Sequence, residues 1–337
     1  MKPMRSYIDI LYNGVDGTNI IGEDCESFSW VDRASGESDT LTLHLSNTGQ
    51  KWMNGFFPSD TDVIKAWLRL EEWPVDYREG RIYCGAFMVD SIKYSGWPEK
   101  LDLSAISVPI NSDFNVKAKS RSWESTTVRS ILGDIATAAG IDLVFDAQDH
   151  NVESMSQSGK VDSTFAKDLC REYGLAIKLY NNKIVVYDQA VYERAAPVYT
   201  ITREDMGTAG AYRIDKQITK TYNSVKIQYT DKSGQTLSYE YTIPDTDGQR
   251  QKFISSKADS LRDAEIKAKA ALRESLRSSR TLTITKTGSA KHVAAQVFQL
   301  EGFGRLDGNY FIDSVTHNRS AGKYTCVISA HLAVTAF

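Results

Sequence analysis

Asp146, Asp149 and His150 are the residues whose types and spacing best suit metal chemistry. They belong to the stretch DAQDHN at 146–151, and carboxylates and imidazoles are common metal ligands. No second cluster stands at ligand spacing, and the stretch follows an expected strand, where polar turn residues are usual. The stretch DTDG at 245–248 resembles part of a calcium loop but lacks the remaining ligand positions. We therefore predict no metal site and no cofactor site.

Cys170 is the candidate nucleophile of the sequence, in the stretch AKDLCREYG beside Arg171. A nucleophile needs a base within hydrogen-bond reach and a group that orients this base. The chain has no GxSxG, no HExxH and no phosphate-binding loop. The adjacent carboxylates Glu71 and Glu72 would point to opposite faces of a strand and cannot act together. We therefore predict no catalytic residues and no enzymatic activity, with Cys170 packed as a small apolar side chain.

The composition is that of an ordinary globular protein. The chain has 337 residues and a formal net charge of −3. This length predicts two or three domains, and the near-neutral charge argues against a general nucleic-acid binder. No stretch has the length of a signal peptide's apolar core or of a transmembrane helix. We expect a protein that is made and folded in a cytoplasm and does not insert into a membrane.

Three regions follow from the periodicity of the apolar residues. Residues 1–112 are expected to form strands; in DTLTLHL, for example, leucines alternate with threonine and histidine. Residues 113–195 change period, with two amphipathic helices that are each followed by a strand, and then a hairpin. Residues 196–337 return to strands, interrupted by a charged helix at about 256–279 with one narrow apolar stripe. We predict a mainly β fold with an α+β insert.

Ten residues occur nearly twice, 223 positions apart. The stretch GAFMVDSIKY at 85–94 matches GNYFIDSVTH at 308–317 without a gap. Continued without a gap, this alignment places Lys100 on Lys323, and both stretches predict a β-hairpin. Two unrelated hairpins also share composition, so chance is one explanation. The other is that the chain contains two similar β-barrel domains, at 1–112 and 196–337. The identical positions are Gly85, Asp90 and Ser91 in the first stretch and Gly308, Asp313 and Ser314 in the second.

Most of the six tryptophans lie in the first third of the chain. Packing in the core and at hairpin edges is one explanation. The other is an association surface, where large aromatic side chains are favoured. The six are Trp30, Trp52, Trp67, Trp73, Trp97 and Trp123.

Five stretches, taken in order, resemble the phage late control D family, the baseplate hub of contractile phage tails. The hub part of type VI secretion spike proteins is similar. No single motif is diagnostic, and the ordered set, which spans nearly the whole chain, carries the resemblance. The stretches are SDTLTLHL, GAFMVDSIKYSGWPEKLDLSA, TVRSILGDIATAAGIDLVF, STFAKDLCREYGLAIKLYNNKIVVYD and LEGFGRLDGNYFIDSVTHNRSAGKYTCVIS.

The resemblance implies a homotrimer with two similar β-barrels in each subunit, so that three copies form a ring of six similar units. Such a ring adapts a sixfold tail tube on one side to a threefold spike on the other. The implied partners are copies of the chain, the tail tube protein, the spike protein and an adjoining baseplate adaptor. The implied location is the tail baseplate of a virion, assembled in the bacterial host cytoplasm. The family has no catalytic residues to transfer, and a spike needle or lysozyme domain is expected on separate proteins.

Two other functions stay open at this point. One is a tail-associated cell-wall hydrolase, which would need an acid/base pair in a cleft. The other is a monomeric wall-binding module, with tryptophans in an exposed row as stacking platforms. The hub predicts an oligomer without catalysis, so molar mass and peptidoglycan hydrolysis separate the three.

Overall fold

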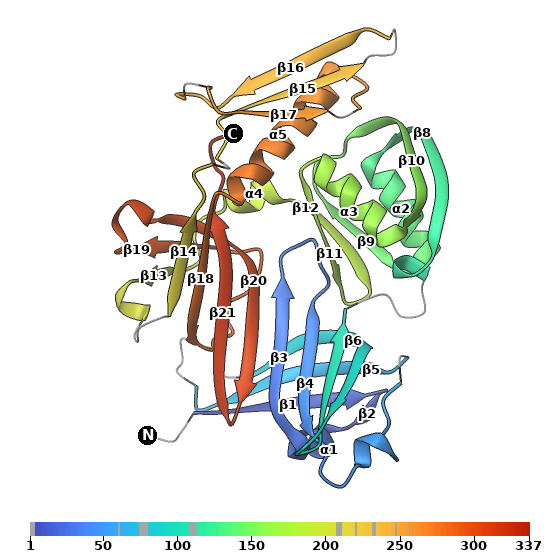
Figure 1. The fold of residues 1–337 in the computed structure, drawn as a ribbon, viewed down its shortest axis with the longest axis vertical. Helices are drawn as coiled ribbons and strands as arrows, with labels where there is room; N and C mark the ends of the chain where they lie inside the picture. Colours follow the sequence, from blue (N-terminus) through green and yellow to red (C-terminus); the bar gives the residue numbers. More distant parts are fainter. Residues whose placement is uncertain are drawn as a thin grey trace.

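The computed structural model describes residues 4–59, 61–73, 80–107, 113–206, 211–219, 221–230, 234–246, 248–255 and 257–337. Strands dominate the fold, as expected from the sequence. A 13-stranded sheet runs through the lower part of the molecule in Figure 1, and smaller α/β units lie above it.

Residues 5–106 form the first half of the large sheet. Alternation sets its faces: Leu41, Leu43 and Leu45 are at most 1% exposed, and the residues between them lie on the other face. The strands pair antiparallel in the order β3-β4-β7-β6-β5-β1-β2. Their bounds are β1 (Arg5–Tyr12), β2 (Val15–Asp16), β3 (Cys25–Arg33), β4 (Thr40–Ser46), β5 (Val63–Glu71), β6 (Gly80–Ser95) and β7 (Lys100–Ile106), with helix α1 (Thr18–Asp24) after β2.

The second half of the large sheet comes from the last part of the chain. Its strands pair antiparallel in the order β14-β18-β21-β20-β19, and β13 lies parallel to β19. The bounds are β13 (Thr200–Thr202), β14 (Tyr212–Lys216), β18 (Arg280–Thr287), β19 (Val297–Glu301), β20 (Gly308–Ser320) and β21 (Lys323–Leu332).

β20 and β3 join the two halves into one sheet. They pair antiparallel, from Ser314 opposite Arg33 to Ser320 opposite Ser27, and Figure 1 shows them side by side in the middle of the molecule. Within the described ranges, the strand pairs leave the sheet open, with β14 and β2 at its ends. Closed barrels are expected from the sequence. Hydrogen bonds among the described strands of one chain do not close a barrel.

The α+β region follows the expected order of helix, strand, helix and hairpin. β12 pairs parallel with β9 and antiparallel with β11. β8 precedes α2 and β10 precedes α3, and the two strands form a separate antiparallel pair that is not expected from the sequence. The bounds are β8 (Ala118–Thr127), α2 (Val128–Ala139), β9 (Asp142–Asp146), β10 (Asn151–Val161), α3 (Asp162–Glu172), β11 (Leu175–Tyr180), β12 (Lys183–Asp188) and α4 (Gln189–Glu193).

Three strands and a helix between residues 224 and 277 form a unit of their own inside the last region. β15 (Ser224–Thr230), β16 (Thr236–Thr242) and β17 (Gln251–Ser255) pair only with one another in the described part of the chain. Helix α5 (Leu261–Arg277) packs on them, and its residues Ala264, Ala268 and Leu272 are fully buried. The sequence groups these strands with the expected second barrel, because their apolar and polar residues alternate as in the other strands. In the structure they belong to a separate sheet.

Helix α5 also reaches the α+β region. Lys267 Nζ lies 2.9 Å from Glu172 Oε1 at the end of α3, so one helix is packed between two units. Across the described residues, no helix has the length and apolar content needed to cross a membrane.

Candidate assembly interface

Asp90 and Asp313 are the bulge residues of two equivalent hairpins. The register between β6 and β7 shifts at Asp90, and the register between β20 and β21 shifts at Asp313. A bulge places one extra residue in one strand and bends it. The short repeat seen in the sequence is thereby confirmed as a repeat in the structure. The flanking pairs correspond: Val89–Ala105 and Ser91–Ser104 in the first hairpin, Ile312–Ala330 and Ser314–Ser329 in the second.

Gly85 and Gly308 take the same backbone conformation in the two hairpins. Their φ angles are 135° and 149°, which residues with a side chain rarely adopt. A Cβ would lie 3.2 Å from the Phe87 ring at Gly85, and 3.2 Å from Leu332 Cδ1 at Gly308. The backbone conformation therefore favours glycine at the matched positions, and a Cβ at either one would also require the neighbouring side chain to shift.

The return strands correct the ungapped alignment. Ser95 pairs with Lys100, and the equivalent Asn318 pairs with Thr325. Lys100 therefore corresponds to Thr325, and its expected match with Lys323 is wrong. The reason is that the second hairpin continues for two further pairs before its turn, so its return strand is offset by two residues.

The equivalence extends to two more strands. β4 pairs with β7 as β18 pairs with β21. Carrying the register across places Thr40–Thr42 on Thr281–Thr283, and both read Thr-Leu-Thr. One strand further, β3 corresponds to β14, with Trp30 at the place of Ile214. The repeated unit therefore comprises β3-β4-β7-β6 in the first half and β14-β18-β21-β20 in the second.

The junction of β3 and β20 buries aromatic side chains from both halves. Trp30 stacks on His317 with ring centroids 4.5 Å apart, and His317 Nδ1 lies 2.8 Å from Tyr324 Oη. His317 is 2% exposed, and burial lowers its pKa to about 4. The imidazole is therefore uncharged at neutral pH, as a stacked ring in an apolar junction requires.

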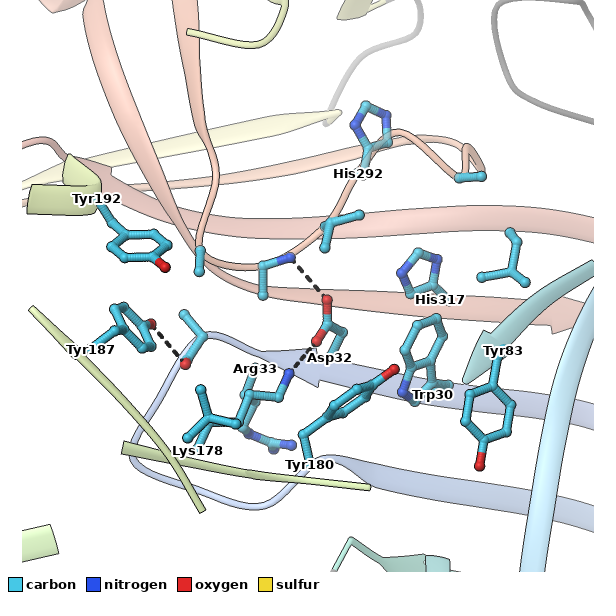
Figure 2. A pocket seen from close by; sticks show the side chains of 17 residues that line it. Trp30, Asp32, Arg33, Tyr83, Lys178, Tyr180, Tyr187, Tyr192, His292 and His317 are labelled. Atoms are coloured by element: carbon cyan, nitrogen blue, oxygen red, sulfur yellow. Dashed lines mark hydrogen bonds and ion pairs between the residues drawn. The ribbon is translucent and has the colours of Figure 1, made fainter. Parts of the chain in front are cut away.

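A cavity of about 370 Å³ opens where this junction meets the α+β region. Figure 2 shows Asp32 of β3 pointing at Lys178 of β11. Lys178 Nζ lies 2.6 Å from Asp32 Oδ1 and 3.1 Å from Asp39 Oδ2, and Ala294 N donates to Asp32 Oδ2 at 2.9 Å. Burial raises the pKa of Asp39 to about 6, although Lys178 opposes this. Lys178 thus pairs with two carboxylates of the first half, and this contact holds the α+β region against the junction.

A second ion cluster, in which His331 and Glu193 are buried and Asp313 is partly exposed, links β20 and β21 with α4 and α5. Asp313 Oδ1 lies 2.8 Å from His331 Nδ1, and Glu193 contacts both His331 and Arg277. Burial alone lowers the pKa of His331, but the carboxylates of Asp313 and Glu193 outweigh it and raise the pKa to about 9. The imidazole is thus a cation at neutral pH. Through Glu193 it links the bulge of the second hairpin to helices α4 and α5.

The ligand-type residues of the sequence do not converge. Asp149 Oδ1 accepts hydrogen bonds from Arg129 N and His150 N, which is a turn and helix-start role. Asp146 Oδ2 accepts from Tyr192 Oη at 2.9 Å. In the described part of the chain, no three His, Cys, Asp or Glu side chains are grouped for a metal. Asp247 of the DTDG stretch lies outside the described residues.

Cys170 is fully buried among apolar side chains of α2, α3 and the neighbouring strands. Burial raises the pKa of its thiol to about 12, which suppresses the thiolate that a nucleophile needs. The tryptophans divide between core and surface. Trp30, Trp52 and Trp73 are buried, whereas Trp97 at the tip of the first hairpin is 88% exposed.

The charged residues of the two clusters are what sequence reasoning missed. Phe28, Trp30 and Asp32 occupy alternate, buried positions of one strand. A carboxylate at a buried strand position indicates that a charged partner is buried beside it. The partner, Lys178, is 146 positions away, and no local pattern connects the two.

A family model described as YQBQ-like matches residues 118–330, from the start of β8 to near the end of β21. The chain belongs to the YQBQ-like family. The match does not name the late control D family, to which the sequence shows its resemblance. No curated protein matches this YQBQ-like chain.

Solved structures share the fold of this YQBQ-like protein over nearly its whole length. A tail protein from Neisseria meningitidis is 13% identical, with a TM-score of 0.72 over 97% of this chain and 96% of that one. The 43 kDa tail protein of prophage MuSo2 from Shewanella oneidensis is 11% identical, with a TM-score of 0.68 over 97% and 98%. An Escherichia coli type VI secretion component is 13% identical, with a TM-score of 0.59 over 93% and 75%. At these identities the likeness establishes the fold.

Proposed function

We propose that this chain is the structural baseplate hub of a contractile phage tail or of a phage-like injection particle, of the late control D type. Three copies form a ring with six similar β units, which adapts a sixfold tail tube to a threefold spike. The partners are the chain itself, the tube protein, the spike protein and an adjoining baseplate adaptor. The hub works in the virion tail and catalyses no reaction.

The observation that carries this proposal is the four-strand unit that occurs twice in one sheet. A homotrimer of a chain with one unit presents three equivalent positions, whereas a homotrimer of a chain with two similar units presents six nearly equivalent ones. The likeness of the fold to tail proteins and to a type VI secretion component supports the same conclusion.

Molar mass by light scattering tests the homotrimer. We expect a particle of three times the 37.6 kDa mass of the chain, and no release of sugar or peptide from purified peptidoglycan. A monomer at every concentration would overturn the hub, and hydrolysis of peptidoglycan that survives repurification would favour the hydrolase.

A further inference from the structure

Among the described residues, one edge of β6 carries backbone groups without a strand partner. β5 pairs with β6 only as far as Met88, and Val89 N donates to Asp62 O at 3.0 Å. Beyond the bulge, residues 91–95 pair with β7 alone among the strands that the structure describes. An open strand edge is a template for another strand.

The equivalent edge of β20 is occupied within the chain. Its residues 314–320 pair with β3, and burial follows from this pairing. Val315 and His317 are 0% and 2% exposed. Their equivalents Ile92 and Tyr94 pack against the core of the first half but stay partly exposed. In the described part of the first half, no strand takes the place that β3 has beside β20.

β14 is the matching open edge. It is the equivalent of β3 and the terminal strand of the large sheet. Phe28 of β3 is 1% exposed, whereas its equivalent Tyr212 is 40% exposed. In Figure 1, β14 and β6 lie on opposite sides of the β20–β3 junction. Since the junction separates them within one chain, the two edges can meet only between two copies.

We infer that residues 91–95 of one copy pair antiparallel with β14 of a second copy, in the register of the β20–β3 junction. This inference rests on the proposed homotrimer and specifies which edges meet. The register places Tyr94 opposite Ile214, as His317 lies opposite Trp30. It also completes a sheet over the partly exposed apolar side chains of both edges.

The charges across this pairing are complementary. Thr316 lies opposite Val31 in the junction, and the equivalent pair is Lys93 opposite Asp215. Opposite charges directly across an antiparallel pair stabilise it, and like charges destabilise it. Lys93 is exposed, and Asp215 is half-buried beside Arg213, whose Nε is 2.8 Å away.

The geometry of this contact favours a ring. Each copy offers one β6 edge and one β14 edge, so the contact is head-to-tail and uses two different surfaces. Such contacts generate closed rings when the rotation between copies closes. Around the ring, the β20–β3 pairing within each chain then alternates with the β6–β14 pairing between chains.

Cysteine cross-linking in the full chain tests the register. The variant Lys93→Cys/Asp215→Cys is oxidised to form a disulfide, which requires Cβ atoms about 3.5–4.5 Å apart; the native cysteines are buried. We expect most of the protein to run as covalent dimer and closed trimer in a non-reducing denaturing gel. The matched control, Lys93→Cys/Arg213→Cys, places the second thiol two residues out of register on the same strand, and we expect at least a fivefold lower yield.

Charge reversal gives a second readout that requires no cross-link. At a fixed protein concentration, Lys93→Glu is expected to lower the trimer fraction at least threefold in sedimentation velocity, and Lys93→Glu/Asp215→Lys to restore it. Both residues lie outside the buried core, so circular dichroism should be that of the wild type.

The outcomes separate this inference from the function on which it rests. A trimer that the 93/215 pair fails to cross-link, or that the 93/213 pair cross-links as well, overturns the pairing of β6 with β14 and leaves the hub. A chain that stays monomeric overturns the homotrimer and the pairing together.

Discussion

Asp313 Oδ1 lies 2.8 Å from His331 Nδ1, whereas Asp90, at the same bulge of the first hairpin, has Ile106 at the place of His331. One backbone irregularity thus serves two purposes. In the second half it holds a buried cation that connects the sheet with α4. In the first half the aspartate is exposed, and the strand beyond it is open for pairing.

Replacement of His331 by glutamine should remove a pH-dependent part of the stability. Its folded pKa of about 9 lies above the unfolded value of roughly 6.5. The protonated ring therefore stabilises the fold fully below about pH 6.5, and this contribution is lost as the pH rises through about 9. We expect wild-type protein to lose on the order of 3 kcal/mol of unfolding free energy across this window in urea titrations, and His331→Gln to lose much less.

His44 offers the matched control for this experiment. It pairs with Asp102 at 2.6 Å, but its side chain is 43% exposed. His44→Gln should keep the wild-type dependence on alkaline pH. An unchanged dependence in His331→Gln would show that the Asp313–His331 pair does not carry the effect.

The junction of β3 and β20 should be sensitive to acid through His317. Its folded pKa of about 4 lies below the unfolded value of roughly 6.5. Between these two pH values the imidazole is protonated in the unfolded chain and neutral in the folded chain. Stability is then lost as the pH falls from about 6.5 to about 4. We expect His317→Phe, which keeps a ring on Trp30, to lose about 3 kcal/mol less than wild type over this interval. A steeper acid loss in the variant would contradict the neutral buried ring.

Lys178→Met should destabilise the protein strongly. It leaves the carboxylates of Asp32 and Asp39 buried without their cation, and breaking a buried ion pair from one side costs about 3–5 kcal/mol. Lys183→Met is the control, since its side chain is 49% exposed and lies 3.7 Å from Asp142; we expect a change of about 0–1 kcal/mol. Urea unfolding followed by tryptophan fluorescence measures both, and equal effects would refute a structural role for the cluster.

Gly174→Ala should test how closely α5 approaches the end of α3. Gly174 has φ 72°, and a Cβ there would lie 3.2 Å from Ala270 Cβ. Gly140 has φ 68° but open space around a Cβ, so Gly140→Ala measures the backbone strain alone, about 1 kcal/mol. We expect Gly174→Ala to lower the thermal midpoint further than Gly140→Ala. Equal shifts of the thermal midpoint would show that α5 moves away from the added methyl group without loss of stability.

The sequence predicted the mainly β fold, the α+β region and the paired hairpins, because alternation and the matched Gly-Asp-Ser pattern are local signals. It did not predict that Thr40–Thr42 repeats at Thr281–Thr283. β5 lies between β4 and β6, whereas β19 lies between β18 and β20. These intervening segments differ in length, so a gapless alignment misses this third strand. The false match of Lys100 with Lys323 has a separate cause, because the second hairpin is two residue pairs longer than the first.

The interface was less accessible to sequence reasoning than the fold. Asp32 and Lys178 are buried only because a strand of the first half and a strand of the α+β region meet. The open edge of β6 likewise has no local signature. It is recognised only by comparison with β20, whose equivalent residues are paired with β3.

Class averages of the purified particle in electron microscopy are the most direct test of the trimeric ring. We expect a ring with a central channel, threefold symmetry and six similar lobes, formed by three copies of the chain. Single monomers, open chains of variable length, or a closed particle with two or four copies would contradict it.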